Sequence, residues 1–493
     1  MISVLAAYWL MYPFIEGCDA PYYAIAARDL ANGTPGSETA RQYFPGVYWF
    51  WRLIAPWTWP HPPQIVNISE ALLCLLCAFT ATLVGRSLKM GPLYQICAFW
   101  AVSACLINFE GLTEVSEQLI LVFFFLSLSL LPRMIVSSGA GYEVALGFLL
   151  ALCLSIKQQS VFVIAPFFLG LLIHFGVDSR SVFRTLLSTA RIGASLATFF
   201  LIFLYISGYR VTDLFGGARY AAGYGSMCVG LSCLMSAVSD YLWLFILPFC
   251  YLIRSWVRRE FSHQSTIVLI TTGAGFMSCC QFLFRPYGHY GMLVAAPLIL
   301  ANCVILQALS ATSRSARGSL PLLAWSLAYA LLIPVGSLWS PRKSSAPISP
   351  WIVPGYTNSP RSISELCNFL PRSEPVLVLP LMFYQTHLSC GTTPASPGLG
   401  YPTFIGGPKL EEIVLSKRYK TIVVFEHFQT SNEVWSSADG CHSDGGCKKI
   451  FDGLAALGYA LSEVFPNLQV KVYTLQLDST EHVSHPQTPG LVD

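Results

Sequence analysis

Charged residues are scarce in this sequence. Of its 493 residues, only 11% are Asp, Glu, Lys or Arg, whereas 54% are hydrophobic. Soluble domains carry about 25% charged residues, so a chain with this few could not cover a water-exposed surface of its size. A single soluble core also does not grow to this length without splitting into domains. The composition therefore excludes an ordinary soluble protein and predicts an integral membrane protein.

Other common features are missing as well. The net charge is only +3, and no run of Lys and Arg resembles a nucleic-acid patch, so we expect no nucleic-acid partner. Among the 16 cysteines, no Cys/His cluster has the spacing of a zinc site. No internal repeat is visible, which counts against transporter folds built from two related halves. Residues 1–15 have neither a basic segment nor a small-residue cleavage site, and they predict a first helix rather than a signal peptide.

Long apolar runs, in contrast, recur along residues 1–340. A helix of about 20 apolar residues crosses a hydrocarbon core of about 30 Å. We expect about eleven such helices, near residues 1–15, 65–85, 93–109, 117–136, 142–156, 159–176, 189–207, 232–253, 264–284, 290–309 and 319–340.

Basic residues mark every second loop between these helices. The positive-inside rule places the loops that contain them in the cytoplasm. With an odd number of crossings, the long first loop (about 16–64) and the C-terminal part then lie outside the cytoplasm. The residues that set this orientation are Arg86, Lys89, Arg133, Arg180, Arg184, Arg191, Arg254, Arg258, Arg259, Arg314 and Arg317.

The sequence changes character at about residue 341. A Pro/Ser-rich linker (341–361) precedes a segment, 362–478, that is typical of a small α/β domain, and residues 479–493 form a polar tail that we expect to be disordered. The predicted fold class is an all-α polytopic membrane bundle with a small extracytoplasmic α/β domain.

Apolar runs within 362–478 predict the individual elements. They indicate strands at Pro375–Leu381, Lys420–Phe425 and Val470–Leu477, and an amphipathic helix at Lys448–Leu457. Four cysteines in this polar part are compatible with one or two disulfides in an oxidising compartment, namely Cys367, Cys390, Cys441 and Cys447.

The first outer loop contains an acidic residue directly after the first span. Asp19 is followed by Tyr22 and Tyr23, and then by Arg28 in an amphipathic stretch. A carboxylate at the water–lipid boundary could act as a base toward a hydroxyl or an amine. Alternatively, Asp19 caps a helix over Tyr22 to Leu30.

Two further outer loops carry charges at the mouths of apolar spans. In the first, Glu114 and Glu117 are three residues apart and would share one face of a helix; a solvated loop is the alternative. In the second, Lys157 and Gln158 interrupt an apolar stretch, and a lipid phosphate would serve as the anionic partner of the lysine. Alternatively, Lys157 extends to the headgroups of the bilayer.

A fourth cluster begins a late span with Arg285, Tyr287, His289 and Tyr290. It offers a second cation for a phosphate and aromatic rings that could stack on a sugar, although an interfacial aromatic belt would look similar. All four clusters fall on the same predicted side of the membrane. A base, further carboxylates and two cations on one side suggest a polar site for an anionic, lipid-anchored substrate.

The order and sidedness of these clusters resemble the GT-C superfamily of membrane glycosyltransferases, in the branch of protein O-mannosyltransferases and aminoarabinose transferases. The resemblance runs from about residue 10 to residue 310. It implies a multi-span enzyme that moves a sugar from a polyprenyl-phosphate carrier to a glycan, lipid or protein acceptor on the outer face. A divalent metal at the outer-loop carboxylates is compatible with the superfamily, and nothing in the sequence requires one.

The resemblance also assigns roles by position. It implies that Asp19 is the base that deprotonates the acceptor. Glu117 fits the second acidic position, with Glu114 as its competitor. Lys157 and Arg285 match positions that hold the carrier phosphate, and His289 and Tyr290 match the late-span motif.

Two other classes of function are compatible with the sequence. A lipid or solute transporter would have polar residues spread through the depth of several spans, whereas here they gather at one face. An inactive paralogue could act as a scaffold through its outer domain. For the enzyme, we expect a location in a bacterial inner membrane.

Overall fold

The computed structural model describes somewhat more than half of the chain. The described residues are 19–32, 44–58, 64–108, 115–137, 139–178, 182–210, 212–213, 235, 241–258, 261–283, 290–312, 360–371, 374–379, 386–387, 390–394, 414–417, 419–425, 453–468 and 470–476. The predicted spans 1–15 and 319–340 and the predicted tail lie outside them. The chain divides into two compact units, Met1–Ile352 and Val353–Asp493.

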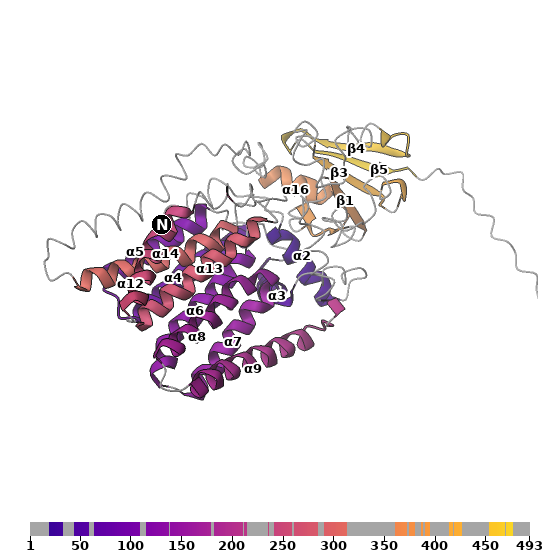
Figure 1. The fold of residues 1–493 in the computed structure, drawn as a ribbon. Coiled ribbons are helices and arrows are strands. Elements are labelled where there is room, and N and C mark those ends of the chain that lie inside the picture. The colour runs from indigo at the N-terminus through magenta and orange to yellow at the C-terminus, as the bar shows by residue number, and fades with distance from the viewer. Residues whose placement is uncertain are drawn as a thin grey trace, which may run out of the picture. The chain divides into compact units, whose positions relative to one another are not determined.

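The first unit is helical throughout its described part (Figure 1). Its principal helices are α2 (Asp19–Asn32), α3 (Pro45–Thr58), α4 (Gln64–Ser87), α5 (Pro92–Asn108), α6 (Val115–Ser137), α7 (Ala140–Ile156), α8 (Val161–Asp178), α9 (Val182–Ile206), α12 (Leu242–Arg258), α13 (His263–Cys279) and α14 (Gly291–Thr312).

Five segments are long and apolar enough to cross a membrane. They are Val115–Ser137, Gln158–Gly176, Thr185–Ile206, His263–Phe282 and Gly291–Ser310, and three shorter apolar helices cover Leu72–Ser87, Pro92–Leu106 and Ala140–Ile156. All eight coincide with predicted spans. The predicted number of eleven stays a prediction, because the remaining crossings fall wholly or partly outside the described residues.

The outward faces of these helices are themselves apolar. Phe183, Leu201 and Ile206 on α9 and Trp256 on α12 are exposed. A soluble protein seldom exposes so many large hydrophobic side chains along whole helices, whereas lipid accepts them without cost. The helical unit is therefore that of a membrane protein.

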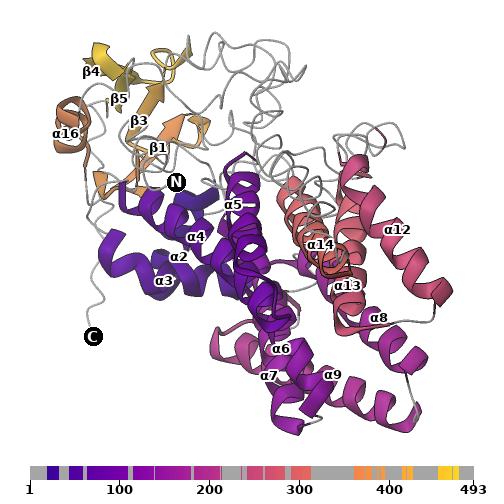
Figure 2. The same ribbon diagram turned by 90° about the vertical axis from the view of Figure 1, so that its left-hand side faces the viewer.

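The helices pack in two groups that meet along α14. In one group, α6 packs against α4 and α7, and α7 runs along α9; in the other, α13 packs between α8 and α14, while α14 also contacts α5 and α12 (Figures 1 and 2). Glycines allow close approach, as is usual between helices in membranes. Gly147 of α7 contacts α9 at Ser195, and Gly275 of α13 contacts α14 at Leu298.

The second unit contains a five-stranded sheet. Its strands are β1 (Pro375–Leu379), β2 (Thr393–Pro394), β3 (Thr421–Phe425), β4 (Tyr459–Phe465) and β5 (Val470–Leu475), in the order β2-β1-β3-β5-β4. β1 pairs in parallel with β2 and β3, whereas β5 pairs antiparallel with both β3 and β4. The buried aliphatic residues of β1 and β3 pack with Val414, Leu454 and Tyr459 into the core.

The predicted strands of this unit are present as β1, β3 and β5. The predicted helix Lys448–Leu457 is wrong at its C-terminal end, because residues 454–458 form a turn in which Tyr459 N donates to Leu454 O. Gly458 ends this turn with a φ of 91°, which glycine adopts without steric cost. Residues 448–452 lie outside the described part. β4 and the helix α16 (Pro360–Phe369) were not predicted.

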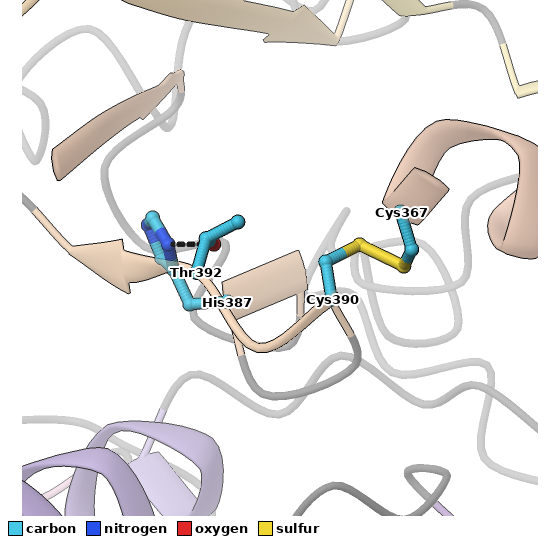
Figure 3. The surroundings of a disulfide bond; sticks show 4 residues. All are labelled: Cys367, His387, Cys390 and Thr392. Carbon is cyan, nitrogen blue, oxygen red and sulfur yellow. Dashed lines mark hydrogen bonds between the residues drawn. A yellow bond between two sulfur atoms is a disulfide. The ribbon is translucent and has the colours of Figure 1, made fainter. Parts of the chain in front are cut away.

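A disulfide joins α16 to the segment before β2. It links Cys367 to Cys390, and close by His387 Nδ1 lies 2.8 Å from Thr392 Oγ1 (Figure 3). One disulfide of the predicted set is therefore present. Cys441 and Cys447 lie outside the described residues.

Candidate functional site

The break between α7 and α8 places a lysine inside the helical unit. Lys157 has extended backbone angles (φ −161°, ψ 148°) between the end of α7 and a 3₁₀ turn, η2 (Gln158–Ser160). Ser160 holds the break, since its Oγ lies 2.6 Å from Cys153 O and 2.7 Å from Lys157 O. The side chain of Lys157 is only 9% exposed, so it needs an anionic partner.

Glu117 supplies that partner from the first turn of α6. Lys157 Nζ donates to Glu117 Oε1 at 2.7 Å, and Glu117 is fully buried. Ser116 completes the group, because its Oγ donates to Glu117 Oε2 at 2.7 Å and lies 3.3 Å from Lys157 Nζ. The N-terminal end of α6 further favours a negative charge at this position. The two predicted clusters on α6 and at the α7–α8 break thus meet.

Tyr290 brings the fourth predicted cluster to the same place. Its ring centroid lies 5.7 Å from Lys157 Nζ, and Tyr290 is 2% exposed. This distance is within the range of a cation–π interaction. Tyr290 immediately precedes α14, a helix of the second group, whereas Glu117 belongs to α6 of the first group. Lys157 therefore contacts residues from both helix groups. We call Ser116, Glu117, Lys157 and Tyr290 the lysine cluster.

The first predicted loop reaches the lysine cluster through α3. A Cβ atom on Gly46 would lie 2.6 Å from Ser155 Oγ and 2.7 Å from Ile156 Cδ1, the two residues directly before Lys157. The backbone of α3 therefore lies directly against the end of α7, where no side chain fits. α2 joins this assembly through a ring contact between Tyr23 and Tyr48, whose centroids are 6.0 Å apart.

The other predicted site residues are described only in part or not at all. Asp19 is the first residue of α2 and precedes Tyr23 by about one helical turn, and Arg28 lies further along α2 and is partly exposed. The side chains of Asp19 and Tyr22 lie outside the described part of the structure. So do four residues in full, namely Glu114, Arg285, Tyr287 and His289.

Four glutamine side chains with unpaired polar atoms lie at this end of the helices. Among the described residues, the Oε1 atoms of Gln118, Gln158 and Gln159 are buried without a hydrogen-bond partner, and so are both amide atoms of Gln281. Gln158 was predicted as a site residue, whereas Gln281, in the 3₁₀ turn η4 (Cys280–Leu283), was not. Its only signal in the sequence is a single amide at the end of a predicted span.

A further ion pair, between a buried glutamate and a half-exposed arginine, joins α7 and α9. Glu143, near the start of α7, accepts hydrogen bonds from Ser188 and from Arg191 at 3.3 Å. It lies at the opposite end of α7 from Lys157, on the side where the sequence predicts cytoplasm. Glu143 and Arg191 therefore provide a comparison for the lysine cluster, because they form an ion pair at the opposite end of the same helix.

The described residues contain no group of three His, Cys, Asp or Glu side chains that could hold a metal ion. The carboxylates for which the sequence allows a metal include Glu114 and Asp19, and their side chains are not among the described ones. Glu117, another of these carboxylates, has Lys157 as its partner. A lysine ammonium is an unsuitable neighbour for a divalent cation, so the described part of the site does not favour a metal.

No family model and no curated protein matches this sequence. Three solved structures of an oligosaccharyltransferase from Archaeoglobus fulgidus show a similar arrangement of elements. The form tethered to an acceptor peptide with the NVT sequon is 13% identical, with 91% of this chain and 72% of that chain covered and a TM-score of 0.46.

The other two have closely similar values. The archaeal enzyme, named AglB, in complex with an inhibitory peptide and a dolichol-phosphate is 12% identical over 89% of this chain and 71% of that chain, with a TM-score of 0.46. A complex with Zn and sulfate is 11% identical over 90% and 70%, also with a TM-score of 0.46. All three scores are below 0.5, and the ligands are those of the archaeal enzyme.

Proposed function

We propose that this chain is an integral membrane glycosyltransferase that moves a sugar from a polyprenyl-phosphate carrier to an acceptor on the outer face of the membrane. The observation that carries the proposal is the lysine cluster. Glu117, Lys157 and Tyr290 come from three separate parts of the sequence and meet at one end of the helices. The resemblance of the same clusters, in order and sidedness, to GT-C glycosyltransferases supports the assignment.

The proposed reaction is an inverting displacement at the anomeric carbon of the sugar. The acceptor atom attacks this carbon from the face opposite the phosphate, and Asp19 takes the proton that the acceptor loses. The bond between the anomeric carbon and the phosphate oxygen breaks, and its electron pair leaves with the lipid phosphate. Because the leaving group is already a weak base, its departure needs cations rather than a general acid.

Among the described residues, Lys157 is the cation to which we assign this role. We assign Glu117 a positioning role, because its carboxylate accepts a hydrogen bond from the ammonium group and so fixes the position of that group. The pair alone has no net charge, so the proposed phosphate site needs the second predicted cation, Arg285, together with Tyr287 and His289. Glu114 remains the candidate for a further carboxylate at the acceptor side.

Transfer of radiolabelled sugar tests the proposal. Membranes that contain the wild-type chain receive a panel of polyprenyl-phosphate sugars, in parallel with membranes that contain Asp19→Asn or Lys157→Met. We expect label to reach an acceptor only with the wild type, and a loss of at least 100-fold in Asp19→Asn, as is typical for removal of a general base.

Glu143→Gln is the matched control. It also removes a buried carboxylate with a cationic partner, but at the opposite end of α7, so transfer per folded molecule should persist. An inserted wild-type chain that transfers no sugar from any donor would overturn the enzyme assignment in favour of a transporter or a scaffold. Full transfer by Asp19→Asn would overturn only the assignment of the base.

A further inference from the structure

Gln281 is a buried side chain whose hydrogen-bonding capacity is unused. It is 4% exposed, and within the described part of the structure neither its Nε2 nor its Oε1 has a hydrogen-bond partner. A buried polar group without a hydrogen bond is unfavourable, and native proteins contain few such groups. An amide with both atoms unsatisfied by the described residues therefore points to an additional partner.

The packing of α8 against α13 places Gln281 at the height of Gln158. The two helices are antiparallel, and a Cβ atom on Gly273 would lie 3.0 Å from Pro166 Cβ. Gln158 lies eight residues before Pro166, and Gln281 lies eight residues after Gly273. Both of these segments end in a 3₁₀ turn, so their axial rises match. Gln281 is therefore level with Gln158 and Gln159, and with the adjacent Lys157.

The packing of α13 against α14 gives the same height independently. A Cβ atom on Gly275 would lie within 3.1 Å of Leu298 Cγ and of Val294 O. Gly275 is therefore level with the midpoint of these two residues, which is residue 296. Gln281 lies six residues after Gly275, and Tyr290 lies six residues before residue 296. Gln281 is thus level with Tyr290 as well, and the ring of Tyr290 is the group that lies beside Lys157 Nζ.

Gln158, Gln159 and Gln281 therefore place amides at the height of the lysine cluster, and each has at least one buried atom without a partner among the described residues. An amide carries no charge, so it is poorly suited to bind a charged ligand group. Hydroxyl groups are better suited, since each can donate to an amide oxygen and accept from an amide nitrogen.

We propose that Gln281, together with Gln158 and Gln159, binds hydroxyl groups of an uncharged sugar while the phosphate that carries it lies near Lys157. This inference rests on the proposed function and specifies its substrate as a neutral hexose or pentose. It makes Gln281 a residue that selects the sugar rather than one that drives the chemistry.

The test compares Gln281→Met with wild type on polyprenyl-phosphate donors that carry a neutral hexose and on deoxy analogues that each lack one hydroxyl. Methionine keeps the length of the side chain and removes both polar atoms. We expect Gln281→Met to lower kcat/KM for the full sugar about 10-fold or more. For the deoxy donor that lacks the bound hydroxyl, the wild type should show the same loss, and Gln281→Met should add nothing to it.

Thr272→Val is the matched control on the same helix. Thr272 Oγ1 is also buried without a partner, but it lies nine residues before Gln281, about 13 Å deeper in the bundle. It should leave kcat/KM unchanged. If wild type transfers the sugar and Gln281→Met does so equally well, or if its effect adds fully to every deoxy substitution, the inference is overturned and the glycosyltransferase stands. If wild type transfers nothing, both fail.

Discussion

The energetics of the lysine cluster depend on both of its charges together. Each charge has lost nearly all of its contact with water, and the two form a direct ion pair. Removal of one partner from a buried ion pair costs about 3–5 kcal/mol, because the remaining charge is left uncompensated, whereas replacement of both partners by apolar groups is often nearly neutral. Variants that replace one or both partners can therefore distinguish the contribution of the pair to stability from its contribution to sugar transfer.

We predict that Glu117→Leu and Lys157→Met each destabilise the protein by about 3–5 kcal/mol, and that the double variant is more stable than either single variant. Neither the single variants nor the double variant should transfer sugar. Thermal unfolding of the purified protein in detergent, with the double-mutant cycle for the pair, measures the first effect. Single variants as stable as wild type would show that the ion pair does not form in the folded protein.

At the scale of elements, the contact between α3 and α7 holds the first loop at the lysine cluster. Pro45 begins α3 at a position where proline is favoured, and Gly46 lets the helix approach the end of α7 closely. The clash that a larger residue would cause includes the backbone carbon of Ser155 at 2.9 Å, which cannot rotate away. The position of α3 therefore depends on the absence of one side chain.

We predict that Gly46→Ala displaces α3 from the α7–α8 break, lowers stability by about 1–3 kcal/mol and reduces transfer at least 10-fold. A matched control is Gly193→Ala in α9, where a Cβ atom meets nothing within 4 Å. There alanine should stabilise the helix by about 0.5–1 kcal/mol and leave transfer intact. Thermal unfolding and sugar-transfer assays on both variants measure these effects. If Gly46→Ala and Gly193→Ala changed stability and transfer equally, the close packing of α3 against α7 would be contradicted.

At the scale of the whole molecule, the sequence predicted those features that depend on apolar runs. It placed the eight described apolar helices of the first unit, and it found β1 and β3 because their aliphatic residues are buried on both faces. It missed β4, whose residues are mostly exposed and do not alternate. The predicted helix Lys448–Leu457 is wrong at its C-terminal end, because residues 454–458 form a turn that ends at Gly458.

The candidate site was predictable to a similar extent. Lys157 was found because a charge inside an apolar run is conspicuous, and Glu117 because it is one of several carboxylates at the mouth of two spans and matches an acidic position of the GT-C resemblance. Their direct contact could not be predicted, because it depends on how α6 and α7 pack. Gln281 gave almost no signal, since a single amide near the end of a span becomes informative only when its burial and missing partners are known.

The second unit depends on its disulfide. Cys367 and Cys390 are 23 residues apart, and closure of a loop of that size stabilises a fold by about 3 kcal/mol in the chain-entropy model. We predict that the double substitution Cys367→Ser and Cys390→Ser makes the C-terminal unit of the full-length protein markedly more sensitive to limited proteolysis. Cys250→Ser, which changes an exposed free cysteine of α12, is the control. Unchanged proteolysis of the double variant would show that the sheet is stable without the bond.

The Glu117–Lys157 pair also bears on how the chain is made. The two residues are 40 positions apart, and both are synthesised before α13 and α14 leave the ribosome. An unpaired lysine that is enclosed among membrane helices is costly, whereas a lysine that enters beside its glutamate has its counterion from the start. α6 and the α7–α8 break can therefore insert into the bilayer before the later helices are synthesised. Tyr290 is synthesised afterwards and packs against an ion pair that has already formed.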